Sequence, residues 1–448
     1  MSVSWRVGGA SAEARDGASS TAAAGRGERG RRAAATVNPR DLPPLPVDVL
    51  IGIVARSDDV ATIIRCAAAW KSLRAAILDP VFYKLLGLRV AANGGFDPNL
   101  LMAVSFRPSV FGTLFDPITF PPSSRNCLNA TLLRSSEPVS YRDGLLVLRQ
   151  SDKKFGELRV CNTITGDVTS LRRMKKVLGA GFTLQYIYRP ALLSVNGGGR
   201  SFELLVMYLK FSTSHGARLE TQTFSSEKAK WSTGRLIHLQ HPDGVRFDFV
   251  ETEESTAPAV VGRSVHWLCR STTPGNFIIL ALDADSVEAT AIDLPQELLA
   301  SMMAPSFGVT SRWRCEKDLI LAANAEGTKL SVIVAEKLAI STWTLQEQDE
   351  GPAGGVSWSR QVVVRRGEIG SQLHTVLDAY QPFRFIVFGE TSGTLLFWIC
   401  GVGLLQLNLG TKKVVAIWLG AAGDFNSNTQ AVLQEINLVS LLKCMKHF

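Results

Sequence analysis

The residues best able to carry chemistry are histidines, cysteines and clustered carboxylates, and the chain spreads them thinly. His238-x-x-His241 is the tightest histidine pair, and Glu251, Glu253 and Glu254 form a short acidic cluster. A zinc site needs three or four ligands at close spacing, and no cysteine or third histidine accompanies the pair. The three glutamates are neighbours in sequence, which is typical of a solvated loop. We therefore expect no metal site and no bound cofactor.

Motifs for nucleophilic and phosphate chemistry are equally sparse. The sequence contains no G-x-S-x-G elbow, no H-E-x-x-H pair and no Walker motif. Gly25-x-Gly27-x-x-Gly30 has the spacing of a dinucleotide fingerprint, but it follows no strand pattern and opens no helix. A phosphate there would have no helix N-terminus to bind. The sequence therefore indicates a binding protein rather than an enzyme.

Length and composition favour several domains and a reducing compartment. At 448 residues the chain exceeds the usual size of one domain, and its seven cysteines form no C-x-x-C pair. The longest apolar run, Leu395 to Leu405, is too short to cross a membrane, and no secretory signal pattern is present. We expect a soluble protein of the nucleus or the cytoplasm, with no membrane partner.

The net charge of +8 is concentrated at the start of the chain. Residues 1–40 hold seven arginines and three acidic residues among many Ala and Gly residues. This segment has too few large apolar side chains to offset the entropy of ordering, so we expect a disordered tail. Its composition fits a nuclear-import segment or, alternatively, an organelle transit peptide. The other basic cluster, at residues 172–176, lacks interleaved aromatic residues, so a nucleic-acid partner is not favoured.

Residues 42–87 show the pattern of several short helices. Pro46 suits a first helical turn, and Asp48 suits the positive end of the helix dipole. Apolar residues then recur at helical spacing, and Asp79-Pro80 interrupts the pattern before a last helix that Gly87 would end. Because some forty residues bury little apolar surface alone, we expect this module to need a partner.

The order of these residues resembles an F-box. The matching positions are Leu45-Pro46-Val47-Asp48-Val49-Leu50-x-x-Ile53, Ile64-x-Cys66, Trp70-x-x-Leu73 and Asp79-Pro80-x-Phe82. In that family the helices dock on a Skp-type adaptor and so join a cullin-based ubiquitin ligase. The resemblance implies adaptor contacts for a set of six residues within 41–88, with Trp70 and Phe82 divided between the interface and the module's own core. The six are Leu45, Pro46, Leu50, Ile53, Trp70 and Phe82. An ordinary helical cap on a β domain is the alternative.

Beyond the helices, residues 89–448 read as short strands separated by turns. The strand-length runs are mostly apolar without alternation and are flanked by Gly, Asp, Asn and Pro, which is typical of strands covered on both faces. The runs are Leu145 to Leu148, Phe202 to Leu209, Phe277 to Leu282, Leu319 to Ala323, Val332 to Val334, Phe383 to Phe388 and Leu395 to Cys400. Inner strands of propeller blades are covered in this way, so we predict a β-propeller.

Hairpin turns suggest a repeat within this region. We place turn tips at Asn162, Ser225, Asp283, Glu336 and Asn408, with separations of 63, 58, 53 and 72 residues. These spacings are longer and less regular than those of WD or kelch blades, so they leave five to eight blades open. The fold class expected is therefore α+β and multidomain, with a short helical module followed by a mainly β propeller.

This region also resembles the F-box-associated domain of the large plant F-box families. The resemblance is carried by residues 142–147, 160–166, 265–268 and 435–442. It implies a kelch-like propeller that recruits targets, and hence a non-catalytic, substrate-recruiting subunit of a Skp–cullin–F-box ubiquitin ligase. The alternative is a propeller interaction scaffold outside the ubiquitin pathway.

Overall fold

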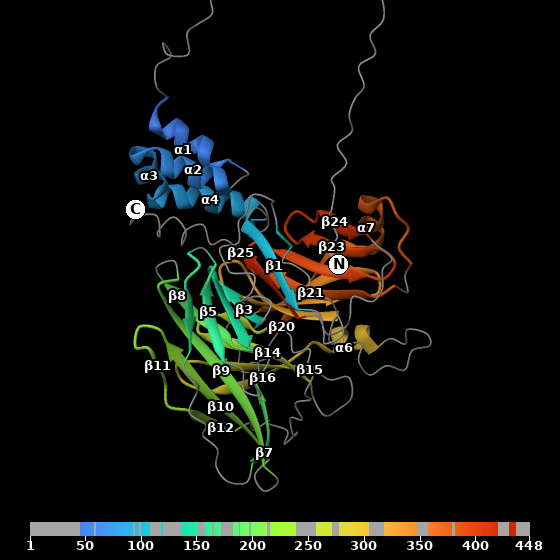
Figure 1. Cartoon of the computed structure of the whole chain (residues 1–448). Coiled ribbons are helices and arrows are strands. Elements are labelled where there is room, and N and C mark those ends of the chain that lie inside the picture. Colours follow the sequence, from blue (N-terminus) through green and yellow to red (C-terminus); the bar gives the residue numbers. More distant parts are fainter. Residues whose placement is uncertain are drawn as a thin grey trace, which may run out of the picture. The chain divides into compact units, whose positions relative to one another are not determined.

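The computed structural model shows short helices followed by a chain that is mostly β-sheet (Figure 1). It describes residues 45–57, 60–92, 95–97, 100–107, 118–119, 136–150, 157–163, 165–171, 182–187, 189–196, 199–212, 216–238, 257–270, 277–303, 318–346, 357–378, 381–419 and 430–435. The chain divides into two compact units, residues 1–45 and 46–448. The predicted disordered tail lies wholly outside the described residues. Of the His238–His241 turn, the structure describes His238 alone. No helix among those residues has the length and apolarity needed to cross a membrane.

In the described part of the chain, four helices follow Pro46, and two more lie between blades of the sheet region. They are α1 (Val47–Ala55), α2 (Val60–Ala69), α3 (Lys71–Ile77), α4 (Pro80–Ala92), α6 (Gln296–Met303) and α7 (Arg366–Leu373). Pro46 immediately precedes α1, and Asp79 accepts a hydrogen bond from the Val81 N–H at the start of α4, as a capping residue should. Gly87 lies inside α4, so the expectation that it ends the last helix is wrong. Helix α4 runs on to Ala92, beyond the expected boundary at residue 88.

Five antiparallel blades of four or more strands form a β-propeller. Blade 1 contains β3 (Ser136–Arg142), β4 (Leu145–Gln150), β5 (Leu158–Asn162) and β6 (Val168–Ser170). Blade 2 contains β7 (Phe182–Ile187), β8 (Ala191–Asn196), β9 (Ser201–Ser212), β10 (Gly216–Ser225), β11 (Lys230–Trp231) and β12 (Arg235–His238). Blade 3 contains β13 (Ala259–Val261), β14 (Ser264–Arg270), β15 (Phe277–Asp283) and β16 (Ala289–Asp293).

The last two blades have the same order, and a smaller sheet completes the ring. Blade 4 contains β17 (Leu319–Ala323), β18 (Leu330–Ala335), β19 (Ala339–Gln346) and β20 (Ser357–Arg365). Blade 5 contains β21 (Phe383–Gly389), β22 (Thr394–Ile399), β23 (Gly403–Asn408) and β24 (Val414–Leu419). The smaller sheet contains β1 (Leu101–Arg107), β2 (Ile118–Thr119) and β25 (Gln430–Glu435).

The ring closes by pairing its first strand with its last. Strand β1 pairs antiparallel with β25, and β25 in turn contacts both β3 of blade 1 and β21 of blade 5. In blade 2 both β7 and β8 pair with β9, so β8, β9 and β10 correspond to the first, second and third strands of the other blades. The first strands of neighbouring blades also contact one another, in the order β3, β8, β13, β17 and β21. These strands therefore line the axis. Closure in this way covers faces of blades 1 and 5 that an open stack would leave exposed, because side chains of β25 pack on both blades.

The strand predictions are confirmed, and the hairpin repeat is more regular than the tips suggested. The third strand of each blade ends at Asn162, Ser225, Asp283, Gln346 and Asn408, with separations of 63, 58, 63 and 62 residues. The predicted tip at Glu336 is wrong for this series, because the turn there joins the second and third strands of blade 4 rather than its third and fourth. That one misplacement produced the uneven spacings of 53 and 72.

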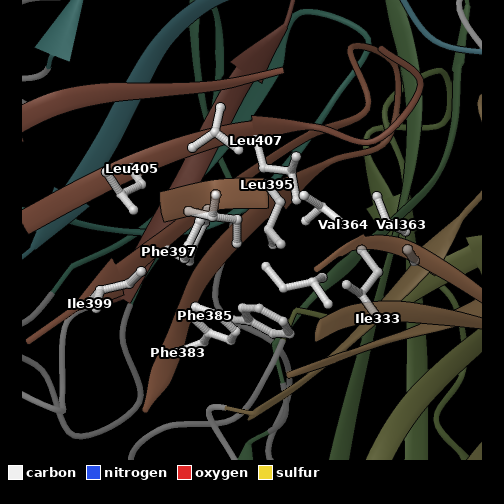
Figure 2. Close-up of a cluster of buried hydrophobic side chains, with 14 residues drawn as sticks. Ile333, Val363, Val364, Phe383, Phe385, Leu395, Phe397, Ile399, Leu405 and Leu407 are labelled. Atoms are coloured by element: carbon white, nitrogen blue, oxygen red, sulfur yellow. The ribbon is translucent and has the colours of Figure 1, made fainter. Parts of the chain in front are cut away.

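The cores of the propeller lie between blades. Figure 2 shows the cluster formed by blades 4 and 5, where Phe383, Phe397 and Leu405 pack with Ile333 and Val364. The Phe383 and Phe397 rings meet edge to face at 5.8 Å. Strands β15 and β22 are buried along nearly all of their length, because each of their faces meets another sheet. This explains their continuous apolar sequences.

Candidate functional site

The four helices of the module share a small core, to which Leu100 from beyond the helices also contributes. Ile63, Ile77 and Phe82 are fully buried, and Val54, Leu73 and Leu86 surround them. These side chains come from all four helices, so each short helix is held by the others rather than by its intrinsic propensity. The structure places Phe82, one of the six predicted adaptor-contacting residues, in this core.

Several large apolar side chains remain exposed on the module. Val49 and Ile53 are 47% and 57% exposed, and their spacing of four residues puts them on one face of α1. Trp70, at the N-cap of α3, is 57% exposed. Leu50 is half-buried and packs against the module core. Of the predicted set, Pro46, Ile53 and Trp70 are therefore available to a partner, and Leu50 is available in part.

Leu45 is the last residue of the first unit and is 56% exposed. Val49 was not among the predicted contacts, although helical spacing from Ile53 could have identified it.

Residues 95–97, which follow α4, contact α4 on one side and blade 5 on the other. Arg89 donates a hydrogen bond to the Ser57 carbonyl at 2.6 Å and forms an ion pair with the buried Asp97. The Asp97 N–H donates to the Thr391 carbonyl at 3.3 Å, and the Phe96 and Phe388 rings meet edge to face at 6.1 Å. The connection between the helices and blade 5 is therefore packed and hydrogen-bonded.

A second feature is a group of charged side chains at the ends of the axial strands, which we call the axial cluster. Its members are Tyr141, Arg142, Asp143, Glu390 and Glu435. Asp143 and Gly144 form the turn after β3 and both have positive φ, as a tight hairpin turn requires. Glu390 follows β21, and Glu435 ends β25.

The axial cluster connects separate sheets through hydrogen bonds to the backbone. Arg142 of blade 1 donates to the Leu192 carbonyl of blade 2 at 3.1 Å. Glu390 accepts from the Ala323 N–H of blade 4 at 3.0 Å. Glu435 accepts from the N–H groups of Thr391 and Ser392 in blade 5 at 3.1 and 2.7 Å. Each bond joins a strand end to a different sheet.

Burial dominates the electrostatics of this cluster. It raises the pKa of Glu390 to about 7, and Arg142 only partly offsets the effect while Glu435 and Asp143 add to it. Burial likewise raises the pKa of Glu435, against the hydrogen bonds that it accepts from Ser392 and Thr391. Tyr141 donates its hydroxyl hydrogen to the Glu435 carbonyl, and burial raises its pKa as well.

The axial cluster has a structural role, because its hydrogen bonds join separate sheets of the ring. The carboxylates of Glu390 and Glu435 accept hydrogen bonds from backbone N–H groups, and the described residues contain no group of three or more potential metal ligands. The sequence analysis missed these residues because they lie far apart in the chain. Their common feature is that each is a polar or charged residue within the last two positions of β3, β21 or β25 or directly after one of these strands.

Comparison with known proteins assigns the chain to a family. It belongs to the family described as "Domain of unknown function (DUF7595)", whose match covers residues 114–448. That range begins after the helical module. No curated protein matches the chain.

Similar solved structures include a prolyl endopeptidase, with 11% identity and a TM-score of 0.31 over 67% of this chain and 46% of that one. TolB from Acinetobacter baumannii has 12% identity and a TM-score of 0.28, over 60% and 51%. A member of the DUF4221 family from Bacteroides vulgatus has 7% identity and a TM-score of 0.35, over 67% and 91%. The chain thus spans about half the length of the first two.

Proposed function

We propose that this protein is a substrate-recruiting subunit of a Skp–cullin–F-box ubiquitin ligase. The observation that carries the proposal is a helical module whose four helices share one buried core and that still exposes Val49, Ile53 and Trp70. Buried Phe82 shapes the module, while the exposed side chains supply an apolar surface for a Skp-type adaptor. The resemblance of residues 45–82 to an F-box gives that partner its identity.

The proposed mechanism requires no catalysis by the chain itself. The module binds the adaptor, and through it a cullin, while the propeller binds a target protein. Holding both on one chain raises the effective concentration of the target near the ubiquitin-charged enzyme. This role places the protein in the nucleus or the cytoplasm, where such ligases act. The propeller fold also fits the alternative, an interaction scaffold outside the ubiquitin pathway.

Co-purification of the full chain with a Skp-type adaptor tests the proposal. Ile53→Arg combined with Val49→Asn should reduce adaptor capture at least tenfold, because a few exposed apolar side chains dominate such interfaces. Ile53 suits this test better than Leu50, since Leu50 also packs against the module core. Leu88→Arg is the matched control, because Leu88 is 68% exposed on α4 and lies outside the predicted set.

The two candidate functions predict different results. A wild-type chain that captures no adaptor removes the ligase proposal and leaves the scaffold. Capture that survives the double substitution shows that this face of α1 is not the docking surface.

A further inference from the structure

Arg189 is a buried arginine that forms no direct ion pair with the described side chains. It lies two residues before β8, the axial strand of blade 2, and only 8% of its surface is exposed. Its Nε has no hydrogen-bond partner, and none of the described side chains forms an ion pair with its guanidinium. The backbone here is fixed, since the Trp267 indole N–H donates to the Arg189 carbonyl at 3.4 Å.

The charged side chains that act on Arg189 leave a net positive charge around it. Glu137 and Arg149 are directly paired across β3 and β4, and Arg149 donates two bonds, at 3.0 and 2.8 Å, to a single carboxylate oxygen of Glu137. Glu137 is therefore already neutralised. Burial lowers the pKa of Arg189 to about 10, with Glu137 opposing this effect and Arg149 adding to it. Two guanidinium groups thus share one carboxylate.

The site lies where blades 1 and 2 meet. Arg149 continues the alternate positions of Leu145 and Val147 in β4, and those two residues pack in the core shared with blade 2. Strands β3 and β8 contact each other as neighbours around the axis. The side chain of Arg149 is 28% exposed, so the group reaches solvent on that side.

These groups have the chemistry of a site for an oxyanion. A buried guanidinium without a partner is strongly unfavourable, and native proteins normally satisfy such groups. The planar fork of arginine fits a carboxylate or a phosphate. We propose that Arg189 anchors an anion-binding site between blades 1 and 2, which takes the carboxylate or phosphate group of a ligand. Arg149 is its further donor. This site does not depend on the ubiquitin-ligase proposal.

Thermal unfolding of the full chain tests the site. Inorganic phosphate, acetate and O-phosphoserine are each titrated against potassium chloride at matched ionic strength. We expect at least one oxyanion to raise the melting temperature saturably, because a ligand that binds only the folded state stabilises it. Arg189→Gln should weaken the effect at least tenfold. Arg235→Gln, which removes an exposed arginine from β12, should leave it unchanged.

The three anions distinguish the possible sources of the group. A lower half-saturating concentration for O-phosphoserine than for inorganic phosphate indicates a group carried on a larger ligand, and the reverse order indicates a free anion. Without added oxyanion, Arg189→Gln should melt at or above the wild-type temperature, since it removes an unpaired buried charge. If none of the anions stabilises the wild type beyond chloride, or if Arg189→Gln responds as the wild type does, the site does not exist. Should Arg189→Gln fail to fold, Arg189→Lys and the wild-type titration decide.

Discussion

Replacing Glu390 with glutamine tests how the axial cluster holds the ring. The substitution removes an ionisable group but keeps a side-chain oxygen that can accept the hydrogen bond from the Ala323 N–H. Burial raises the pKa of Glu390 from 4.5 to about 7. An acid of this kind contributes stability that is complete below pH 4.5 and is lost as the pH rises through 7, because ionisation is easier in the unfolded chain.

The size of the effect follows from that pKa change. Each pH unit between the unfolded and folded pKa values corresponds to about 1.4 kcal/mol, which gives an upper bound of about 3 kcal/mol. Glu390 is only partly buried, so solvent screening lowers the expected effect to about 1–2 kcal/mol. At pH 8 the free energy of unfolding of Glu390→Gln should therefore exceed that of wild type by this amount. At pH 4 the two proteins should be equally stable.

Urea unfolding of both proteins at several pH values, followed by tryptophan fluorescence, measures this difference. Glu227→Gln is the matched control, because Glu227 is exposed in the turn between β10 and β11 and should give no such pH-dependent gain. The reasoning is refuted if Glu390→Gln is less stable than wild type at pH 8. That result would mean that the ionised carboxylate is favourable in the folded chain, with Arg142 as its counterion.

Two further predictions concern packing. Phe82→Ala should destabilise the helical module by about 3–5 kcal/mol, because a fully buried aromatic side chain is lost, and limited proteolysis should then cut within residues 45–92. Unaltered resistance to protease would contradict the placement of Phe82 in the core. Gly393→Ala should lower the stability of the chain by roughly 1–3 kcal/mol more than Gly262→Ala, as measured by urea unfolding. Both glycines have positive φ, but an added methyl group would clash with the Phe96 ring only at Gly393, so equal losses would contradict the contact.

The sequence by itself determined the local elements. Continuous apolar runs such as Phe277 to Leu282 indicated strands covered on both faces, because no half-exposed strand can be apolar throughout. Apolar residues at helical spacing indicated the helices before residue 92. Asp79-Pro80 marked a helix boundary, and α4 does begin at Pro80. Turn residues such as Asn162 and Asp283 marked hairpins because their side chains bond to the backbone that follows.

The assignment of apolar residues within the helical module was decided by the tertiary structure. Phe82 and Ile53 are both apolar and both fit a helical stripe, but one is in the core and the other is exposed. An apolar pattern alone does not distinguish a residue buried within a module from one that meets a partner, since both are driven by removal from water.

Contacts between residues far apart in the chain could not be predicted from the sequence either. Arg142, Glu390 and Glu435 come together only because the ring closes, which brings the ends of the axial strands to one place. The same closure leaves Arg189 buried beside an occupied carboxylate. Local patterns fix strands and turns because those depend on near neighbours in the chain. The charges around the axis depend on which strands become neighbours in space.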